Sequence, residues 1–121
     1  GRTQAFEVQA LRLGNLALLG LEGEVFARYQ LELEADSPLQ PTVLVGYANG
    51  CVGYVPTADE YRRGGYEVGE AGRRRPGRGT WAYQVYPSVQ MLAPGSEAAI
   101  RAGARRLLAE LSLPGAAPAD P

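Results

Sequence analysis

The residue best placed for chemistry early in the chain is Glu24, which follows Gly23 just after an apolar run. Residues 16–21 are continuously apolar and fit a strand buried on both faces, so Glu24 would lie at the carboxyl end of that strand. Ligands bind at this edge of an open α/β sheet, and a carboxylate there can hold a metal or act as a base. A glutamate in a first helical turn also simply suits the helix dipole, so both interpretations stand.

Tyrosines gather in the glycine-rich stretch 46–69, where they are Tyr47, Tyr54, Tyr61 and Tyr66. A tyrosine can bury its ring while its hydroxyl finds a hydrogen-bond partner. The stretch is expected to be irregular and to lie on the surface of a scaffold, where sites are usually built. The tyrosines would either line a pocket together or anchor the loop with one ring each.

An arginine-rich loop follows at residues 72–79, before a possible strand or extended segment at 81–91. Its arginines would contact phosphates or form a solvated loop, and its glycine spacing fits neither a dinucleotide fingerprint nor a P-loop. Cys51 is the only cysteine, and the chain contains no histidine. A histidine-based triad, a histidine general base and a self-contained histidine zinc site within the chain are therefore excluded.

Composition describes an ordinary globular chain: 121 residues, 45% hydrophobic and 21% charged, with a net charge of -1. The length fits one domain, and the charge balance excludes a nucleic-acid footprint over the whole chain. No apolar run approaches the ~20 residues of a membrane span. Because the chain begins at Gly1 and its only methionine is Met91, we expect a piece of a longer protein. Secretion and a cytoplasmic location both stay open.

The first elements expected are a strand over 5–13, a tight turn at 14–15 and the buried strand 16–21. A helix is predicted to begin near Glu24. It would end at 36–38, because the residue before a proline avoids the helical conformation.

A second buried strand is predicted over 42–47, so that strand, helix and strand form a right-handed βαβ crossover. Thr57 is expected to cap a short helical turn. An amphipathic helix follows over 97–111 with Ser96 as its N-cap, and 112–121 would be a flexible tail. The sequence therefore predicts an α/β fold: a strand-rich core with one crossover helix and a C-terminal amphipathic helix.

The order of small motifs in this chain resembles the neutral/alkaline (non-lysosomal) ceramidase family. A loop of small residues with Asn49 leads to Tyr-x-x-Thr at Tyr54, then an acidic pair with a tyrosine, then Tyr66-Glu67. The upstream strand running into Gly-Glu, with its carboxylate at Glu24, matches as well. The resemblance covers roughly 5–67 and, more loosely, the final helix.

The resemblance implies that residues 1–111 are the C-terminal part of a zinc-dependent catalytic domain, a fragment of something larger. It implies Glu24 and Tyr54 as zinc ligands, beside two histidines from the remaining N-terminal part of the same domain. It implies Tyr66 as a catalytic, substrate-binding residue that donates to the developing oxyanion. The activity implied is hydrolysis of the N-acyl linkage of a ceramide-like lipid or small amide by zinc-activated water. This chain alone would be inactive, because it lacks the histidines.

The chain departs from the family over residues 68–94, and Pro56 replaces a small polar or β-branched residue. It looks more like the shorter bacterial relatives, so a zinc-dependent amidase is a firmer expectation than a ceramidase. The alternative is a non-catalytic binding module or an inactive family member, with loop 72–79 contacting nucleic acid or another anionic partner.

Overall fold

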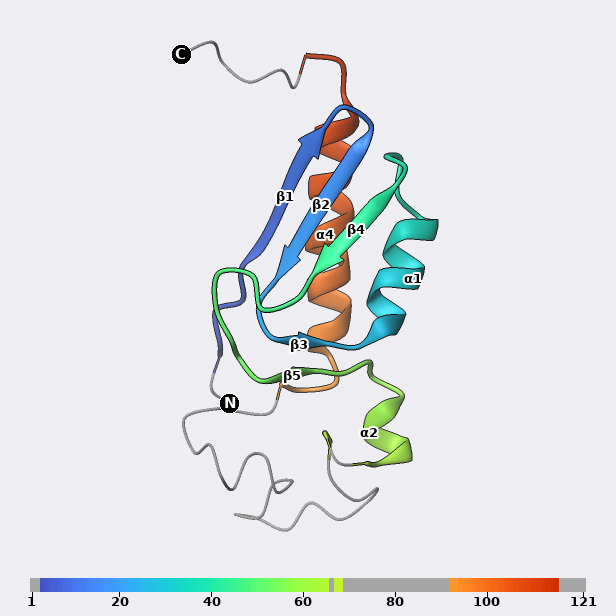
Figure 1. The fold of residues 1–121 in the computed structure, drawn as a ribbon. Helices are drawn as coiled ribbons and strands as arrows, with labels where there is room; N and C mark the ends of the chain where they lie inside the picture. The colour runs from blue at the N-terminus through green and yellow to red at the C-terminus, as the bar shows by residue number, and fades with distance from the viewer. Residues whose placement is uncertain (1–2, 66, 69–91, 116–121) are drawn as a thin grey trace.

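A three-stranded sheet forms the centre of the structure, a computed structural model of the chain (Figure 1). β1 (Val8–Leu13) and β2 (Leu16–Leu21) are antiparallel and joined by the predicted tight turn, where Gly14 has φ 62°. β4 (Thr42–Val45) pairs with β2 in parallel, which gives the order β1-β2-β4. The structure describes residues 3–65, 67–68 and 92–115.

α1 (Ala27–Ala35) connects the two parallel strands, as the βαβ prediction required. Tyr29 and Leu33 point from it into the core. The predicted helix start near Glu24 is wrong, because Glu24–Val25 form a short strand, β3, that pairs in parallel with β5 (Tyr54–Val55). The chain is therefore still extended at Glu24 and turns helical only after Phe26.

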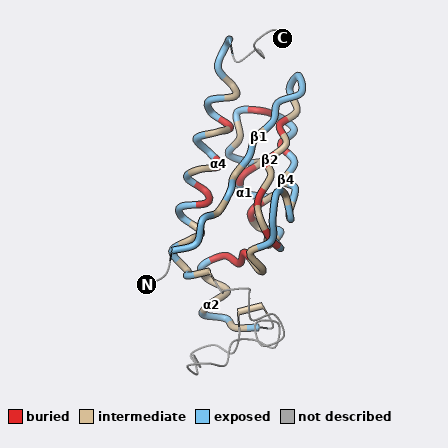
Figure 2. The backbone as a smooth tube through the Cα atoms, turned by 90° about the vertical axis from the view of Figure 1, so that its left-hand side faces the viewer, coloured by how far each residue is buried: buried red, intermediate tan, exposed pale blue. Residues whose placement is uncertain are grey.

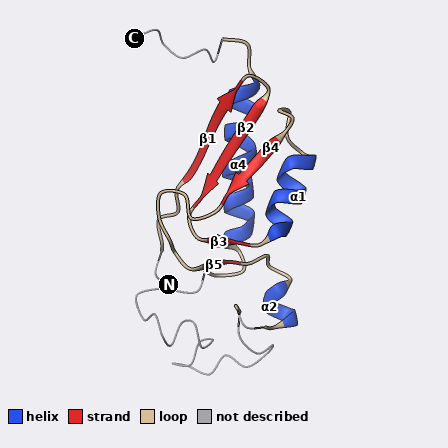
Figure 3. Cartoon of the chain, in the orientation of Figure 1, coloured by secondary structure: helices blue, strands red, loops and turns tan. Residues whose placement is uncertain are grey.

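α4 (Ser96–Ser112) packs along β1 and beside α1, on the same face of the sheet (Figure 3). Its buried apolar residues Ile100, Ala104 and Leu108 belong to the predicted stripe. Ser96 is the first helical residue and not the N-cap, because Gly95 takes the cap position without a side-chain hydrogen bond. The helix includes the first residue of the predicted tail, and 116–121 lie outside the described residues.

The core lies between the sheet and the two helices, and the buried residues of β2, α1 and α4 are red in Figure 2. On β2 only the alternate residues Ala17, Leu19 and Leu21 are fully buried. The prediction that 16–21 is buried on both faces is therefore wrong, and the predicted buried strand 42–47 is shorter, Thr42–Val45, with Val43 and Val45 exposed. Helices cover one face of the sheet, whereas two-sided burial needs a layer on each.

The other face of the sheet is apolar and open to solvent among the described residues. Its exposed members are Leu11 (51% exposed), Leu13 (63%), Val43 (42%) and Val45 (45%). Strand register places Leu11 opposite Leu18, and Leu18 opposite Val43, so these side chains form one continuous row. A contiguous apolar patch of this kind usually marks a contact surface.

The segment after β4 is irregular, as expected, until β5 and the short helix α2 (Glu60–Arg63). Thr57 does not cap α2, because Asp59 holds the cap position and Thr57 is buried beside it. The arginine-rich loop 72–79 and the possible strand 81–91 lie outside the described residues. Within the described part of the chain, no helix is long and apolar enough to cross a membrane.

Candidate functional site

The paired strands β3 and β5 lie beyond the carboxyl ends of β2 and β4, the edge where α/β sheets bind ligands (Figure 1). Glu24 and Tyr54 are direct partners in this pairing. Directly opposite residues of neighbouring strands project to the same face, so both side chains leave the ladder together. Glu24 is exposed and Tyr54 is half-buried. The structure thus brings together the two residues that the sequence predicts as metal ligands.

Gly23 makes this pairing possible through the close approach of two backbone segments. Its φ of 108° is a conformation that side-chain-bearing residues rarely adopt. A Cβ at this position would lie 2.5 Å from the carbonyl oxygen of Gly53 and 3.0 Å from Cγ2 of Val55. Next to it, the Glu24 amide donates a 2.8 Å hydrogen bond to the same Gly53 oxygen. Steric crowding therefore explains why the Gly-Glu motif has a glycine at this position.

Tyr47 contacts Glu24 directly, a contact that sequence reasoning missed. Its hydroxyl donates a 2.6 Å hydrogen bond to Oε2 of Glu24. The bond to the carboxylate raises the pKa of Tyr47 to about 12, because ionising the phenol would place two negative charges together. Tyr47 was predicted only as one tyrosine of a cluster. Its position after β4 was the available signal, since β4 and β2 end at the same edge.

The remaining tyrosines behave differently from one another. Tyr61 donates a 2.6 Å hydrogen bond to the carbonyl oxygen of Leu92, which fits the anchoring interpretation. Tyr66, the predicted oxyanion donor, lies outside the described residues, so its role stays a prediction. Tyr47 contacts Glu24, and Glu24 is the strand partner of Tyr54, so these two tyrosines both lie next to Glu24.

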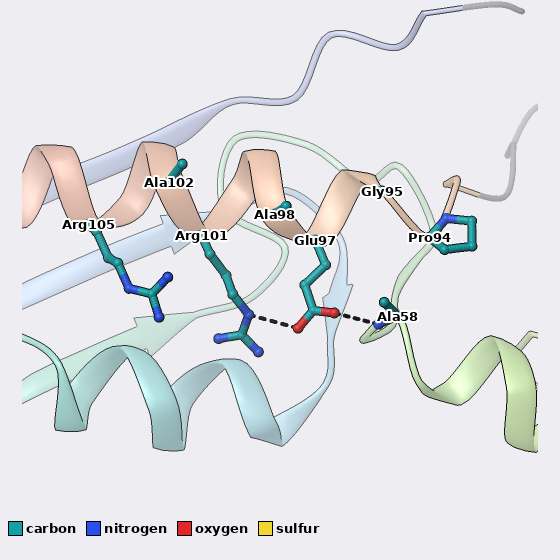
Figure 4. A pocket seen from close by; sticks show the side chains of 8 residues that line it. All are labelled: Ala58, Pro94, Gly95, Glu97, Ala98, Arg101, Ala102 and Arg105. Carbon is teal, nitrogen blue, oxygen red and sulfur yellow. Dashed lines mark hydrogen bonds and ion pairs between the residues drawn. The ribbon is translucent and has the colours of Figure 1, made fainter.

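The segment that carries β5 is held in place by α1 and α4, and Figure 4 shows the contact with α4. The Ala58 amide donates to Glu97 of α4, and the Tyr29 hydroxyl of α1 donates to the Pro56 carbonyl oxygen at 3.3 Å. Burial raises the pKa of Tyr29 well above its usual value. An open groove of ≈ 590 Å³ lies beside these contacts at the start of α4, and no tyrosine lines it.

Arg101 is the most buried charged side chain in the described part of the chain, 7% exposed. Its Nε donates to Glu97 at 2.8 Å, and its guanidinium lies 4.4 Å from the centre of the Tyr29 ring. Nη2 is 3.0 Å from Oε2 of Glu32, close enough for an ion pair but not aligned as a hydrogen bond. Arg101, Glu97, Glu32 and Tyr29 form a cluster that connects α4 to α1.

Asp59 organises the chain between β5 and α2. It accepts hydrogen bonds from Thr57 Oγ1 at 2.7 Å and from Arg28 Nη1 at 2.8 Å. These bonds, with Arg63 at 3.1 Å, lower the pKa of Asp59 to about 2. Arg28 belongs to α1, so this ion pair is another link between the helix layer and the segment that carries Tyr54.

Two of the residues expected to bind zinc lie within the described part of the chain. Glu24 and Tyr54 offer two oxygen ligands on adjacent strands, acceptable to zinc beside imidazoles. No group of three or more His, Cys, Asp or Glu side chains within the described ranges is placed to hold a metal ion. Zinc sites take three or four protein ligands, so these two side chains alone would not complete one. Cys51 is exposed in the same irregular segment.

Comparison with known proteins adds no relative: no family model matches the chain, and no curated protein or solved structure matches it.

Proposed function

We propose that this chain is the C-terminal part of the catalytic domain of a zinc-dependent amidase resembling neutral/alkaline ceramidase. The observation that supports it most is the pairing of Glu24 with Tyr54 at the carboxyl edge of the sheet. Two residues that a family resemblance names as ligands need not be neighbours in an arbitrary fold. Here the pairing of β3 with β5 makes them neighbours, and Gly23 has no Cβ that would clash with the Gly53 oxygen across this pairing.

The open apolar face of the sheet supports the proposal that this chain is one part of a larger domain. A row of leucines and valines on an uncovered sheet face calls for a second layer. The proposed partner is the remaining N-terminal part of the same domain, which would also carry the two histidines. A zinc site shared between two layers explains why this chain supplies only half of the ligands.

Bound zinc would activate a water molecule and polarise the amide carbonyl of a ceramide-like lipid or small amide substrate. In this proposal Glu24 and Tyr54 hold the metal, and the Tyr66 hydroxyl donates to the carbonyl oxygen of the substrate as negative charge develops. Glu24 is exposed at the end of the sheet, which leaves it accessible to ligands from another layer.

The test uses the parent protein, meaning the product of the longest open reading frame that contains this chain. Expected results are one zinc per parent chain and release of fatty acid from an N-acyl sphingosine. The isolated 121-residue chain should retain no stoichiometric zinc after dialysis, because two oxygen ligands hold it poorly. A parent without zinc and without amidase activity would overturn the proposal in favour of a non-catalytic module.

Two matched substitutions in the parent separate the proposed roles of the tyrosines. Tyr54→Phe should lose zinc, because a ring without oxygen cannot bind the metal. Tyr66→Phe should keep zinc and lower turnover about 100- to 1,000-fold, the usual loss for one oxyanion donor. Both changes remove one hydroxyl and leave a ring, so each controls for packing at the other. Equal zinc loss in both variants would show that the roles are misassigned.

A further inference from the structure

Tyr47 adopts a backbone conformation that its side chain makes costly. Its φ is 56°, in the left-handed region, where a bulky residue is uncommon. Such a conformation is strained and persists only where surrounding contacts dictate it. A glycine would adopt it without that cost, so the backbone gives no reason for a tyrosine here.

Two backbone hydrogen bonds fix this turn against the end of β2. The Tyr47 amide donates to the Gly23 oxygen at 2.9 Å, and the Ala48 amide donates to the Leu21 oxygen at 3.1 Å. These bonds hold the turn that carries Tyr47 beside Glu24, and Tyr47 as a whole residue is 56% exposed. The ring therefore adds little to the core, and its main contact of consequence is the hydroxyl bond to the carboxylate.

That bond uses one of the two carboxylate oxygens. Oε2 of Glu24 accepts the 2.6 Å bond from Tyr47, while Oε1 accepts no hydrogen bond from the residues that the structure describes. A carboxylate held at one oxygen presents a single oxygen in a fixed direction. Groups that orient a metal-binding side chain in this way typically contribute 10- to 100-fold to metal affinity.

We propose that Tyr47 is a positioning residue that holds Oε2 of Glu24 and leaves Oε1 as the one oxygen available to a metal ion. This inference rests on the proposed function for the metal, but the pairing of Tyr47 with Glu24 is testable without any metal. A freed carboxylate in a Tyr47 variant would be able to bind through both oxygens. The experiment therefore has one metal-free arm and one metal-loaded arm.

The metal-free arm is a double-mutant cycle on the unfolding of the 121-residue chain, with Tyr47→Phe, Glu24→Gln and both together. The unfolding equilibrium constants should be non-additive by about three- to tenfold, the net effect of one hydrogen bond. Tyr61→Phe combined with Glu24→Gln is the control and should be additive, because Tyr61 bonds to Leu92 instead. Additive behaviour of Tyr47 and Glu24 would overturn the proposal.

The metal-loaded arm uses the parent protein with Co²⁺ in place of zinc, since cobalt reports its coordination number in its visible spectrum. Tyr47→Phe should bind the metal about 10- to 100-fold more weakly in competition with a chelator. Its visible absorption should also weaken, as expected when a second carboxylate oxygen joins the coordination shell. Tyr47→Gly removes the backbone strain as well as the hydroxyl, and it should lose metal affinity to the same extent.

The outcomes distinguish this inference from the proposed function. A parent that binds no cobalt or zinc overturns the proposed function and the one-oxygen role with it, while coupling in the first arm would still establish the Tyr47–Glu24 pair. A parent that binds metal equally with and without the Tyr47 hydroxyl, with an unchanged spectrum, overturns the positioning role and leaves the proposed function standing.

Discussion

Replacing Gly23 with alanine tests whether the ladder between β3 and β5 depends on the close approach of two backbones. The added Cβ would meet the Gly53 oxygen at 2.5 Å, which is backbone and cannot rotate away. The strain of a side chain at φ 108° is worth about 1–3 kcal/mol, and overpacking adds about 1–3 kcal/mol. We therefore expect Gly23→Ala to lower the free energy of unfolding by about 2–6 kcal/mol.

Gly14→Ala provides the matched control, because Gly14 also has a positive φ (62°) but nothing within 4 Å of its would-be Cβ. It carries the conformational cost without the clash, about 1–2 kcal/mol. Urea unfolding followed by circular dichroism measures both variants against the unchanged chain. With a slope near 2 kcal/mol per molar urea, the Gly23→Ala midpoint should fall by about 1–3 M and the Gly14→Ala midpoint by less than about 1 M.

Equal midpoint shifts in the two variants would refute the steric reasoning, because only Gly23 faces a backbone oxygen. Complete loss of a cooperative transition in Gly23→Ala would agree with it, provided that Gly14→Ala still folds. In the parent protein, Gly23→Ala should also lose zinc, since separating the strands moves Glu24 away from Tyr54.

Three further predictions concern the surroundings of the site. Arg101→Ala should lower the free energy of unfolding by about 3–5 kcal/mol, because it leaves Glu97 without its buried cation; a loss below about 1 kcal/mol would place the cluster with surface ion pairs. Asp59→Asn should make the free energy of unfolding less dependent on pH in the acid range. The pKa of Asp59 is lowered to about 2 in the folded chain from about 4 in the unfolded chain, so its carboxylate stabilises the fold above about pH 4. This stabilisation is lost as the pH falls from about 4 towards 2, so an unchanged pH dependence of unfolding in the variant would contradict the assignment. In the isolated 121-residue chain, the double variant Leu11→Gln and Leu13→Gln should bind less of a hydrophobic dye with little change in stability, because both leucines are exposed; a large loss of stability in that chain would mean that they are packed.

The elements that sequence predicted well are those with local signals. The hairpin follows from a Gly-Asn turn between the strand predicted over 5–13 and the apolar run 16–21, and α4 follows from an apolar stripe at helical spacing. The βαβ unit is also confirmed, since β2 and β4 are parallel and α1 connects them. In each case the information lies in one continuous stretch of the chain.

The elements that sequence missed depend on residues far apart in the chain. β3 and β5 are two residues each, too short for any periodic pattern, and they exist because Gly23 and Gly53 let the segments meet. The apolar run 16–21 predicted burial on both faces, but a run of leucines cannot say whether a second layer is present. The burial of Arg101 depends on Glu97, Glu32 and the Tyr29 ring, which only the packing of α4 on α1 assembles.

The same distinction explains how much of the candidate site was within reach of sequence reasoning. Glu24 and Tyr54 were named from a motif, whereas Tyr47 was not, because its role follows from a left-handed turn that no local preference favours. Strain of this kind is retained where a side chain is needed in one place. Near Glu24 the strained residue is Tyr47, whereas the positive φ values of Gly23 and Gly53 suit glycine. The cost falls on the loop, while the helix layer anchors its far end through Glu97 of α4 and Arg28 of α1. A carboxylate held by a costly turn on a braced segment is pre-organised, which is the property that a metal ligand needs.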